Sequence, residues 1–146
     1  KLKLMQTEMT SIVFDFQKLE VYKKSRRFHI SCKSILKSIA TEKYVGDQLG
    51  RASYSVVLNI AEGSAKQTKP DRKNFFTISR GSVFECVAIL DILREEEKIG
   101  EQEYFSVMKI ADEISRIIFC CERSIYGSQI LNALFIRKLR MRSGSR

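Results

Sequence analysis

Apolar residues recur along this chain at alternating steps of three and four, the spacing of one buried face of an α-helix. Four such stretches are present, and the first three predict helices over residues 17–40, 47–65 and 69–98. An acidic turn over residues 95–103 leads into a fourth helix, which we expect to end near residue 127. Four helices joined by short connections predict an all-α, up-down four-helix bundle.

The first predicted helix separates an apolar seam from a basic stripe. The seam consists of Val21, Ser25, Phe28, Cys32, Ile35 and Ile39. His29 and Leu36 flank this seam and widen the buried face. The basic stripe on the outside of the helix consists of Lys23, Arg26, Lys33 and Lys37. We therefore expect this helix to present its cations to solvent.

The third predicted helix is apolar on almost its whole circumference. At about 100° per residue, Val83 and Leu90 share one face, whereas Phe84, Ala88 and Ile92 lie on the opposite side. Each apolar face of a helix has to be covered. Because a bundle of four helices covers only one of these faces, the second cover has to come from another subunit. The sequence therefore predicts a homo-oligomer.

Polar residues interrupt the apolar seams of the second and third predicted helices. Asn59 falls where an apolar residue is expected, and a buried amide without partners costs roughly 1–3 kcal/mol. Glu85 is expected to be half buried, with Arg80 or Arg51 as its partner. We therefore predict a structural polar network between these helices, comprising Asn59, Glu62, Arg80, Ser82 and Glu85.

The chain has 146 residues, one proline and no tryptophan, a composition that favours helices over a turn-rich β fold. Its length fits one domain. We expect the bundle to occupy residues 14–127, between an N-terminal tail (1–13) and a basic C-terminal extension (128–146). In that extension, Ser128 is placed to cap a short separate helix.

The formal net charge is +9, but it is unevenly distributed. Residues 85–113 contain nine acidic and three basic side chains, a net of −6, so the remainder carries +15. This segregation predicts that one end of the molecule attracts polyanions while the other end stays free or meets a basic partner. The candidate phosphate contacts are Lys23, Arg26, Arg27, Lys33, Lys37, Arg51, Arg137, Lys138, Arg140 and Arg142.

Residue types that carry catalysis are scarce. His29 is the single histidine, which excludes most catalytic triads and most zinc enzymes, and its spacing to Cys32 finds no further metal ligand nearby. Glu62 and Glu85 lie on adjacent predicted helices, but di-metal bundles need Glu-x-x-His pairs. Glycine-rich phosphate loops are absent. We expect no catalytic residue, no metal site and no cofactor.

The ends and the cysteines bear on the cellular compartment. No apolar run approaches the ~20 residues of a membrane span, and no signal-peptide core is present, so we expect a cytoplasmic protein. Translation is expected to start at Met5 or Met9, with residues 1–4 and 143–146 coming from an upstream reading frame or a vector. We expect four reduced cysteines that act as buried apolar fillers in a reducing cytosol. They are Cys32, Cys86, Cys120 and Cys121.

Several motifs are spaced as in a known family. They are Phe-Asp-Phe-Gln-Lys-Leu-Glu-Val-Tyr at 14–22, Gln48, Arg51-Ala52, Asn-Ile-Ala-Glu-Gly at 59–63, and Arg-Gly-Ser at 80–82 followed by Glu85. Through them, most of the chain resembles the bacterial four-helix-bundle proteins named for open reading frames inside 23S ribosomal RNA intervening sequences. It departs from them in its C-terminal extension and in lacking a Phe-Pro turn over residues 41–46.

The same fold serves as the accessory variability protein of diversity-generating retroelements. The resemblance therefore implies a basic homopentamer that holds RNA and a reverse transcriptase. With the charge pattern, it predicts a non-enzymatic, oligomeric adaptor that binds RNA or DNA by shape and charge. Two alternatives stay open at this point. One is a protein scaffold whose acidic rim at 95–103 binds a basic partner, and the other is attachment to a membrane surface through residues 131–142.

Overall fold

The structure is a computed structural model that describes the backbone of residues 13–142 and the side chains of residues 13–123. This part of the chain is helical and contains no strand. The helices are α2 (Asp15–Lys18), α3 (Glu20–Ser38), α4 (Lys43–Ala65), α5 (Lys69–Glu95) and α6 (Glu101–Arg142). The all-α prediction is confirmed.

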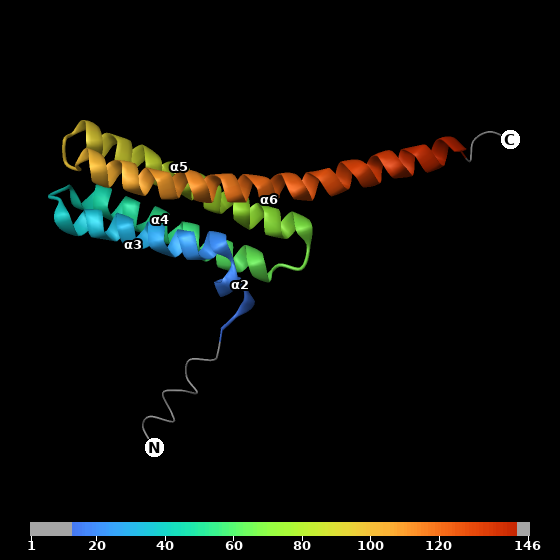
Figure 1. Cartoon of the computed structure of the whole chain (residues 1–146), viewed down its shortest axis with the longest axis horizontal. Helices are drawn as coiled ribbons and strands as arrows, with labels where there is room; N and C mark the ends of the chain where they lie inside the picture. The colour runs from blue at the N-terminus through green and yellow to red at the C-terminus, as the bar shows by residue number, and fades with distance from the viewer. Residues whose placement is uncertain (1–12, 143–146) are drawn as a thin grey trace, which may run out of the picture.

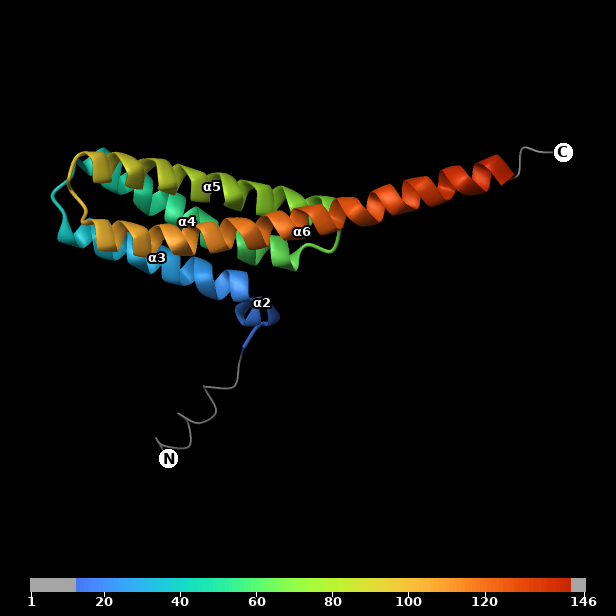
Figure 2. The same cartoon turned by 45° about the horizontal axis from the view of Figure 1, so that its top comes forward.

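The four long helices run alternately up and down and lie side by side (Figures 1 and 2). Around the bundle, α3 lies against α4, α4 against α5, α5 against α6, and α6 against α3. The α3–α4 pair and the α5–α6 pair therefore form opposite sides of the molecule. The short helix α2 packs at the start of α3 and also contacts α4.

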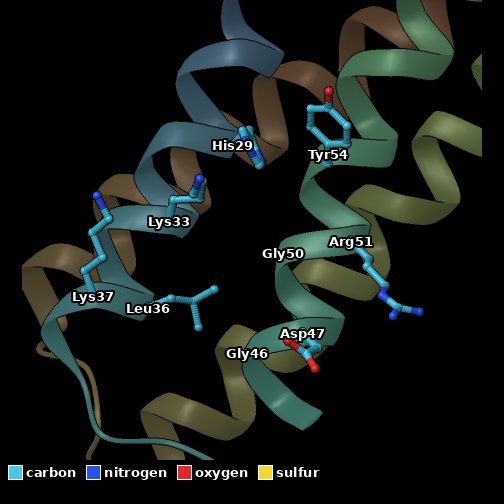
Figure 3. A pocket seen from close by; sticks show the side chains of 9 residues that line it. All are labelled: His29, Lys33, Leu36, Lys37, Gly46, Asp47, Gly50, Arg51 and Tyr54. Atoms are coloured by element: carbon cyan, nitrogen blue, oxygen red, sulfur yellow. The ribbon is translucent and has the colours of Figure 1, made fainter. Parts of the chain in front are cut away.

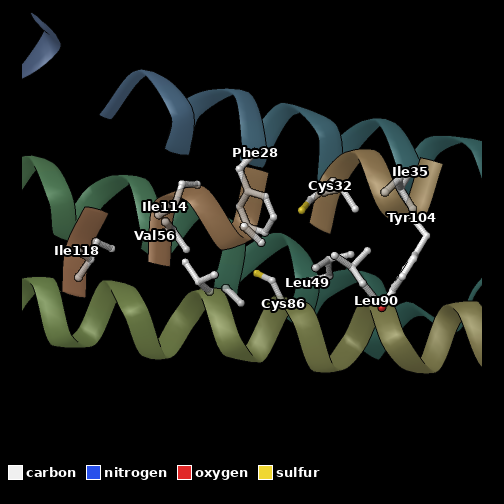
Figure 4. Close-up of a cluster of buried hydrophobic side chains, with 14 of the residues drawn as sticks. Phe28, Cys32, Ile35, Leu49, Val56, Cys86, Leu90, Tyr104, Ile114 and Ile118 are labelled. Atoms are coloured by element: carbon white, nitrogen blue, oxygen red, sulfur yellow. The ribbon is translucent and has the colours of Figure 1, made fainter. Parts of the chain in front are cut away.

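All four long helices contribute to one apolar core, part of which is drawn in Figure 4. Its largest fully buried side chains include Phe28, Ile35, Leu49, Ile60, Leu90, Leu93, Ile114 and Ile118. The seam predicted for the first helix is buried throughout α3, and Ile39 is half buried just beyond its end. Val83 and Leu90 are buried as predicted for the third helix.

Two of the four cysteines lie in this core. Cys32 and Cys86 are fully buried, and all four cysteines are free thiols. A hydrogen bond with Cys32 raises the pKa of the Cys86 thiol far above its usual range, and burial raises it further. Cys121 is half buried and Cys120 is exposed. The expectation that these cysteines fill the core is therefore wrong for Cys120.

The first helix begins later than predicted, because the chain turns at Leu19. The backbone of Leu19 is extended (φ −64°, ψ 131°), and its N–H donates to the Phe16 carbonyl at 3.1 Å. Phe16 packs edge to face on Tyr22, with ring centroids 4.9 Å apart. This aromatic contact holds α2 against the first turn of α3. The extended backbone at Leu19 divides the two helices, whereas the periodicity alone predicted one continuous helix.

The connection from α4 to α5 ends at a side-chain cap followed by a proline. Thr68 caps α5, since its hydroxyl accepts the Asp71 N–H at 3.2 Å, and Pro70 lies in the first turn. Gly63, near the end of α4, has no positive φ. A Cβ at Gly63 would lie 2.9 Å from the Phe76 ring and 3.0 Å from Cβ of Phe75. Gly63 therefore permits a close approach of the first turns of α5.

The last helix is much longer than predicted. We expected it to end near residue 127, with Ser128 capping a separate short helix, but α6 is continuous to Arg142. Beyond the α4–α5 turn it projects alone from the bundle (Figure 1). A single interior glycine, Gly127, costs a helix only about 1 kcal/mol. It is therefore insufficient to end one that is already 26 residues long at that point.

Candidate nucleic-acid interface

The cations predicted to contact phosphate on α3 and α4 are all exposed. They are Lys23, Arg26, Arg27, Lys33, Lys37 and Arg51. The structure brings Lys33, Lys37 and Arg51 together around one hollow between the two helices. The side chains of Arg137, Lys138, Arg140 and Arg142 lie outside the described residues.

The hollow has a volume of about 500 Å³ and opens to solvent on the α3–α4 side of the bundle (Figure 3). From α3 it is lined by His29, Lys33, Leu36 and Lys37. From α4 it is lined by Gly46, Asp47, Gly50, Arg51 and Tyr54. We call it the α3–α4 hollow.

Two glycines one turn apart on α4 create this space. A Cβ built at Gly50 would meet no heavy atom within 4 Å, and one at Gly46 would meet only Leu36 Cδ2 at 3.8 Å. The Leu36 side chain points from α3 towards this part of α4 (Figure 3). The absence of side chains at two successive turns therefore leaves an open floor with an apolar patch at Leu36.

The rim of the hollow is positive and its cations are available. Lys33 and Lys37 stand on α3, Arg51 stands on α4, and Asp47 is the one acidic residue of the lining. Within the described side chains, no ion pair engages Lys33, Lys37 or Arg51. Their charge is thus free to meet an anionic ligand.

His29 is held in one orientation by a serine. Its Nδ1 lies 2.9 Å from the Ser53 hydroxyl, which itself donates to the Gly50 carbonyl at 3.1 Å. Because the serine proton is used on Gly50, the hydroxyl accepts from His29 Nδ1–H, and the neutral ring then has an acceptor at Nε2. Burial lowers the pKa of His29, and the charge of Lys33 lowers it further.

Tyr54 adds an aromatic surface that the sequence interpretation missed. Its side chain is 53% exposed, and its ring lies 5.3 Å from the His29 ring, centroid to centroid, at an interplanar angle of 49°. The available signal was the spacing of Asp47, Gly50, Arg51 and Tyr54 at steps of three and one, which puts them on one side of α4.

The other exposed cations of α3 lie away from the hollow. Arg27 faces α6, where its charge contributes to lowering the pKa of Glu113, although Lys24 is the main cause of that shift. Arg26 lies over the Tyr22 ring at 5.9 Å from its centroid. Arg26 and Arg27 are adjacent in the sequence and so do not face the same way on α3.

The predicted separation into a basic end and an acidic end is wrong. Lys98, in the acidic turn between α5 and α6, pairs with Glu42 at the start of α4 at 3.1 Å. The acidic turn and the α3–α4 hollow therefore lie at the same end of the bundle. The acidic residues of 85–113 lie at the adjoining ends of α5 and α6 and in the turn between them, on the opposite side of the same end of the bundle.

The predicted polar network is also divided. Asn59 is half buried, and its Nδ2 donates to the Ser55 carbonyl at 2.9 Å and to its hydroxyl at 3.0 Å. The Ser55 hydroxyl lies 2.9 Å from that of Ser82, which links α4 to α5. Glu62 is exposed. Asn59 and Ser82 thus belong to one network through Ser55.

Arg80 and Glu85 have other partners. Arg80 donates at 3.2 Å to Glu122, a buried carboxylate of α6 that also accepts from Thr77 at 2.8 Å. Glu85 is exposed, not half buried as predicted, and accepts from Gln48 of α4. Arg80 and Ser82 are two residues apart and so face different neighbouring helices. Sequence reasoning missed Glu122, which lies four residues after the buried Ile118 and so on the same face of α6.

The second apolar face predicted for the third helix is uncovered in the single chain. Phe84, Ala88 and Ile92 of α5 are exposed. Phe84 and Phe119 of α6 share the Arg80 guanidinium, which lies 5.2 Å and 5.0 Å from their ring centroids. The exposed apolar face therefore continues from α5 onto α6. Within the described residues, no helix is both long enough and apolar enough to cross a membrane.

Comparison with known proteins identifies relatives of this bundle. A family model described as 23S rRNA-intervening sequence protein matches residues 17–120. The fold is similar to the crystal structure of a protein of unknown function from the S23 ribosomal protein family of Bacteroides thetaiotaomicron. That similarity has a TM-score of 0.65 at 24% identity and covers 70% of this chain and 97% of the other. No curated protein matches the sequence.

Proposed function

Since this chain belongs to the 23S rRNA-intervening sequence protein family, we propose that it is a non-enzymatic, cytoplasmic adaptor that binds structured RNA. The observation that carries this proposal is the group of unpaired cations, Lys33, Lys37 and Arg51, around the α3–α4 hollow. The name of the family points to an RNA-related role. The rim of the hollow is the surface that we propose binds the RNA.

The mechanism is neutralisation of phosphates. Lys33 and Lys37 lie one turn apart on α3, and Arg51 lines the hollow from α4 with its guanidinium turned away from α3 (Figure 3). Cations placed in this way contact the phosphate backbone and release its counterions, which gives strong binding at low salt with little sequence preference. The acidic residues of 85–113 lie in the opposite helix pair, so they do not oppose an RNA strand on α3 and α4.

Assembly is the second part of the proposal. The exposed face of Phe84, Ile92 and Phe119 is apolar enough to need a cover, and a second copy of the chain supplies one. The resemblance to retroelement accessory proteins motivates a homopentamer and a reverse transcriptase as protein partner. Five copies multiply the formal charge of +9 to about +45, which strengthens attraction to polyanions.

The test is fluorescence-anisotropy binding to a structured RNA and to single- and double-stranded DNA across a salt series. The double variant Lys33→Gln/Lys37→Gln is expected to reduce the log-log salt slope for RNA by about 2. The matched control Lys109→Gln/Arg116→Gln removes two exposed charges from α6 and is expected to leave the slope unchanged. Negligible binding to all three ligands at low salt would contradict the proposal.

A protein scaffold is the second candidate function. Glu95, Glu97 and Glu103 are exposed around the α5–α6 turn and form an acidic rim suited to a basic partner. Other acids there are already paired, Glu101 with Arg94 at 2.7 Å and Glu96 with Lys98 at 2.9 Å. Capture of a protein partner that persists in Lys33→Gln/Lys37→Gln and disappears when the acidic rim is neutralised would favour the scaffold.

A further inference from the structure

We infer that the α3–α4 hollow holds one unpaired nucleotide of an RNA, with the base against Tyr54 and Leu36 and the phosphate between Lys33 and Lys37. This inference rests on the proposed RNA binding and names the part of the RNA that the site recognises. It predicts a preference that charge alone does not give. Loops, bulges and single strands bind better than a continuous duplex of equal charge.

The size and openness of the hollow fit such a ligand. Its volume of about 500 Å³ lies within the roughly 300–1,000 Å³ of sites for small organic ligands. The bases of a duplex are stacked inside the helix, whereas those of loops and bulges can be splayed out onto a protein surface. The hollow therefore admits an unpaired base and excludes a paired one.

The surfaces inside the hollow suit a base. Half of the Tyr54 side chain is exposed, while His29 supports the ring from one side. Gly46 and Gly50 leave bare helix backbone beside it, so a flat ring can approach α4 closely. Stacking of a base on an exposed aromatic side chain is a common source of affinity for unpaired nucleic acid.

The polar groups are placed for the sugar, the base edge and the phosphate. Asp47 would repel a phosphate, but its carboxylate accepts hydrogen bonds from a base amino group or a ribose hydroxyl. His29 Nε2 is an acceptor in the neutral ring. Lys33 and Lys37, on the α3 rim, are cations and hydrogen-bond donors, which suits them to the phosphate. An acid and an acceptor within a basic site indicate a ligand that carries donors as well as negative charge.

The experiment compares an RNA hairpin that carries an unpaired loop with a blunt RNA duplex of equal length and charge, both fluorescently labelled. Gly50→Leu fills the hollow, and Gly81→Leu is its control, because a Cβ at either glycine meets nothing within 4 Å. Tyr54→Ala removes the stacking surface, and Tyr44→Ala is its control, since Tyr44 is 73% exposed on the same helix and does not line the hollow.

We expect Gly50→Leu and Tyr54→Ala to weaken binding of the hairpin about tenfold and to leave binding of the duplex unchanged. Their melting temperatures are expected to be no lower than those of their controls. A 4-thiouridine in the loop is expected to crosslink to the peptide that contains Tyr54. Equal losses for hairpin and duplex, or wild-type hairpin binding by Gly50→Leu, would overturn the inference alone. Failure of the wild-type protein to bind either RNA would overturn the proposed function as well.

Discussion

Glycine residues set how closely the helices of this protein approach one another, and their effects differ by position. Gly63 lies against the rings of Phe75 and Phe76, with no room for a Cβ. Gly50 and Gly81 face open space. The same residue type therefore serves close packing at one site and an open surface at two others.

Replacement of Gly63 by Ala is expected to destabilise the fold by about 1–3 kcal/mol, because the added methyl group overpacks a contact that has no free volume. Gly81→Ala, in the exposed interior of α5, is expected to stabilise it by about 0.5–1 kcal/mol through helix propensity. Urea denaturation followed by circular dichroism measures both. Equal effects of the two substitutions would contradict the packing role of Gly63.

His29 makes stability depend on pH. Its folded-state pKa is lowered from the usual value of about 6.5, first by burial and then by Lys33. The unfolded state therefore binds the proton more readily, and the contribution of His29 is present above the usual pKa and lost as the pH falls through the folded-state value. The other charged or titratable groups around the hollow are Lys37, Asp47, Arg51 and Tyr54.

Wild-type protein is expected to lose more stability than His29→Gln between about pH 7.5 and 5. Glutamine can keep a hydrogen bond to Ser53 but does not titrate, so the difference between the two proteins isolates the histidine from the carboxylates. Chemical denaturation at several pH values gives this difference directly. If the free energy of unfolding of the two proteins changes in parallel with pH, titration of His29 does not contribute to the pH dependence of stability.

At the scale of helices, the ends are set by local turn chemistry. The end of α5 is closed by the N–H of Glu97, which donates to the Arg94 carbonyl, and that of Lys98, which donates to the Leu93 carbonyl, both at 2.9 Å. This is a Schellman motif, in which the residue in the left-handed region is usually glycine. Here it is Glu97, with φ of 57°.

Glu97→Gly is expected to stabilise the protein by about 0.5–1 kcal/mol, because glycine adopts this backbone conformation without a Cβ penalty. Glu96→Gly is the control, since Glu96 has φ of −78° and gains nothing from glycine. It is expected to be neutral or destabilising. Thermal melting of both variants at one ionic strength tests the prediction, and equal melting shifts for the two would contradict it.

The interiors of the helices and the facing ends of α4 and α5 could be predicted from the sequence, whereas several other helix ends could not. Apolar spacing locates the buried seam from Val21 to Ile35, because the same side of the helix faces the core at every turn. The breaks at Leu19 and Glu97 and the continuation through Gly127 depend on single contacts and on energies of about 1 kcal/mol. Periodicity does not contain that information.

The candidate site shows the same division. Exposure of Lys33 and Lys37 follows from their position opposite the seam of α3. The hollow, in contrast, depends on how α3 and α4 are aligned, because it forms where Gly46 and Gly50 pass Leu36. Such an alignment belongs to a pair of helices. The spacing along α4 places Tyr54 on the same side as Arg51, but the hollow beside it cannot be inferred from either helix alone.

At the scale of the whole molecule, the exposed apolar face makes the state of assembly testable. The double variant Phe84→Lys/Ile92→Lys places two charges on this face and is expected to reduce the mass in light scattering towards the 16.9 kDa of one chain. Tyr44→Lys, on an exposed position of α4, is the control. A wild-type mass of one chain would contradict the proposed homo-oligomer.

The length of α6 also gives the protein a strongly asymmetric outline. At 1.5 Å per residue, its 42 residues extend about 63 Å, roughly twice the length of the 19-residue α3. A particle with such a projecting rod has a larger maximum dimension and more hydrodynamic drag than a sphere of the same mass. The apparent mass inferred from its elution volume is therefore larger than its true mass. The number of subunits has to be measured by light scattering or sedimentation equilibrium.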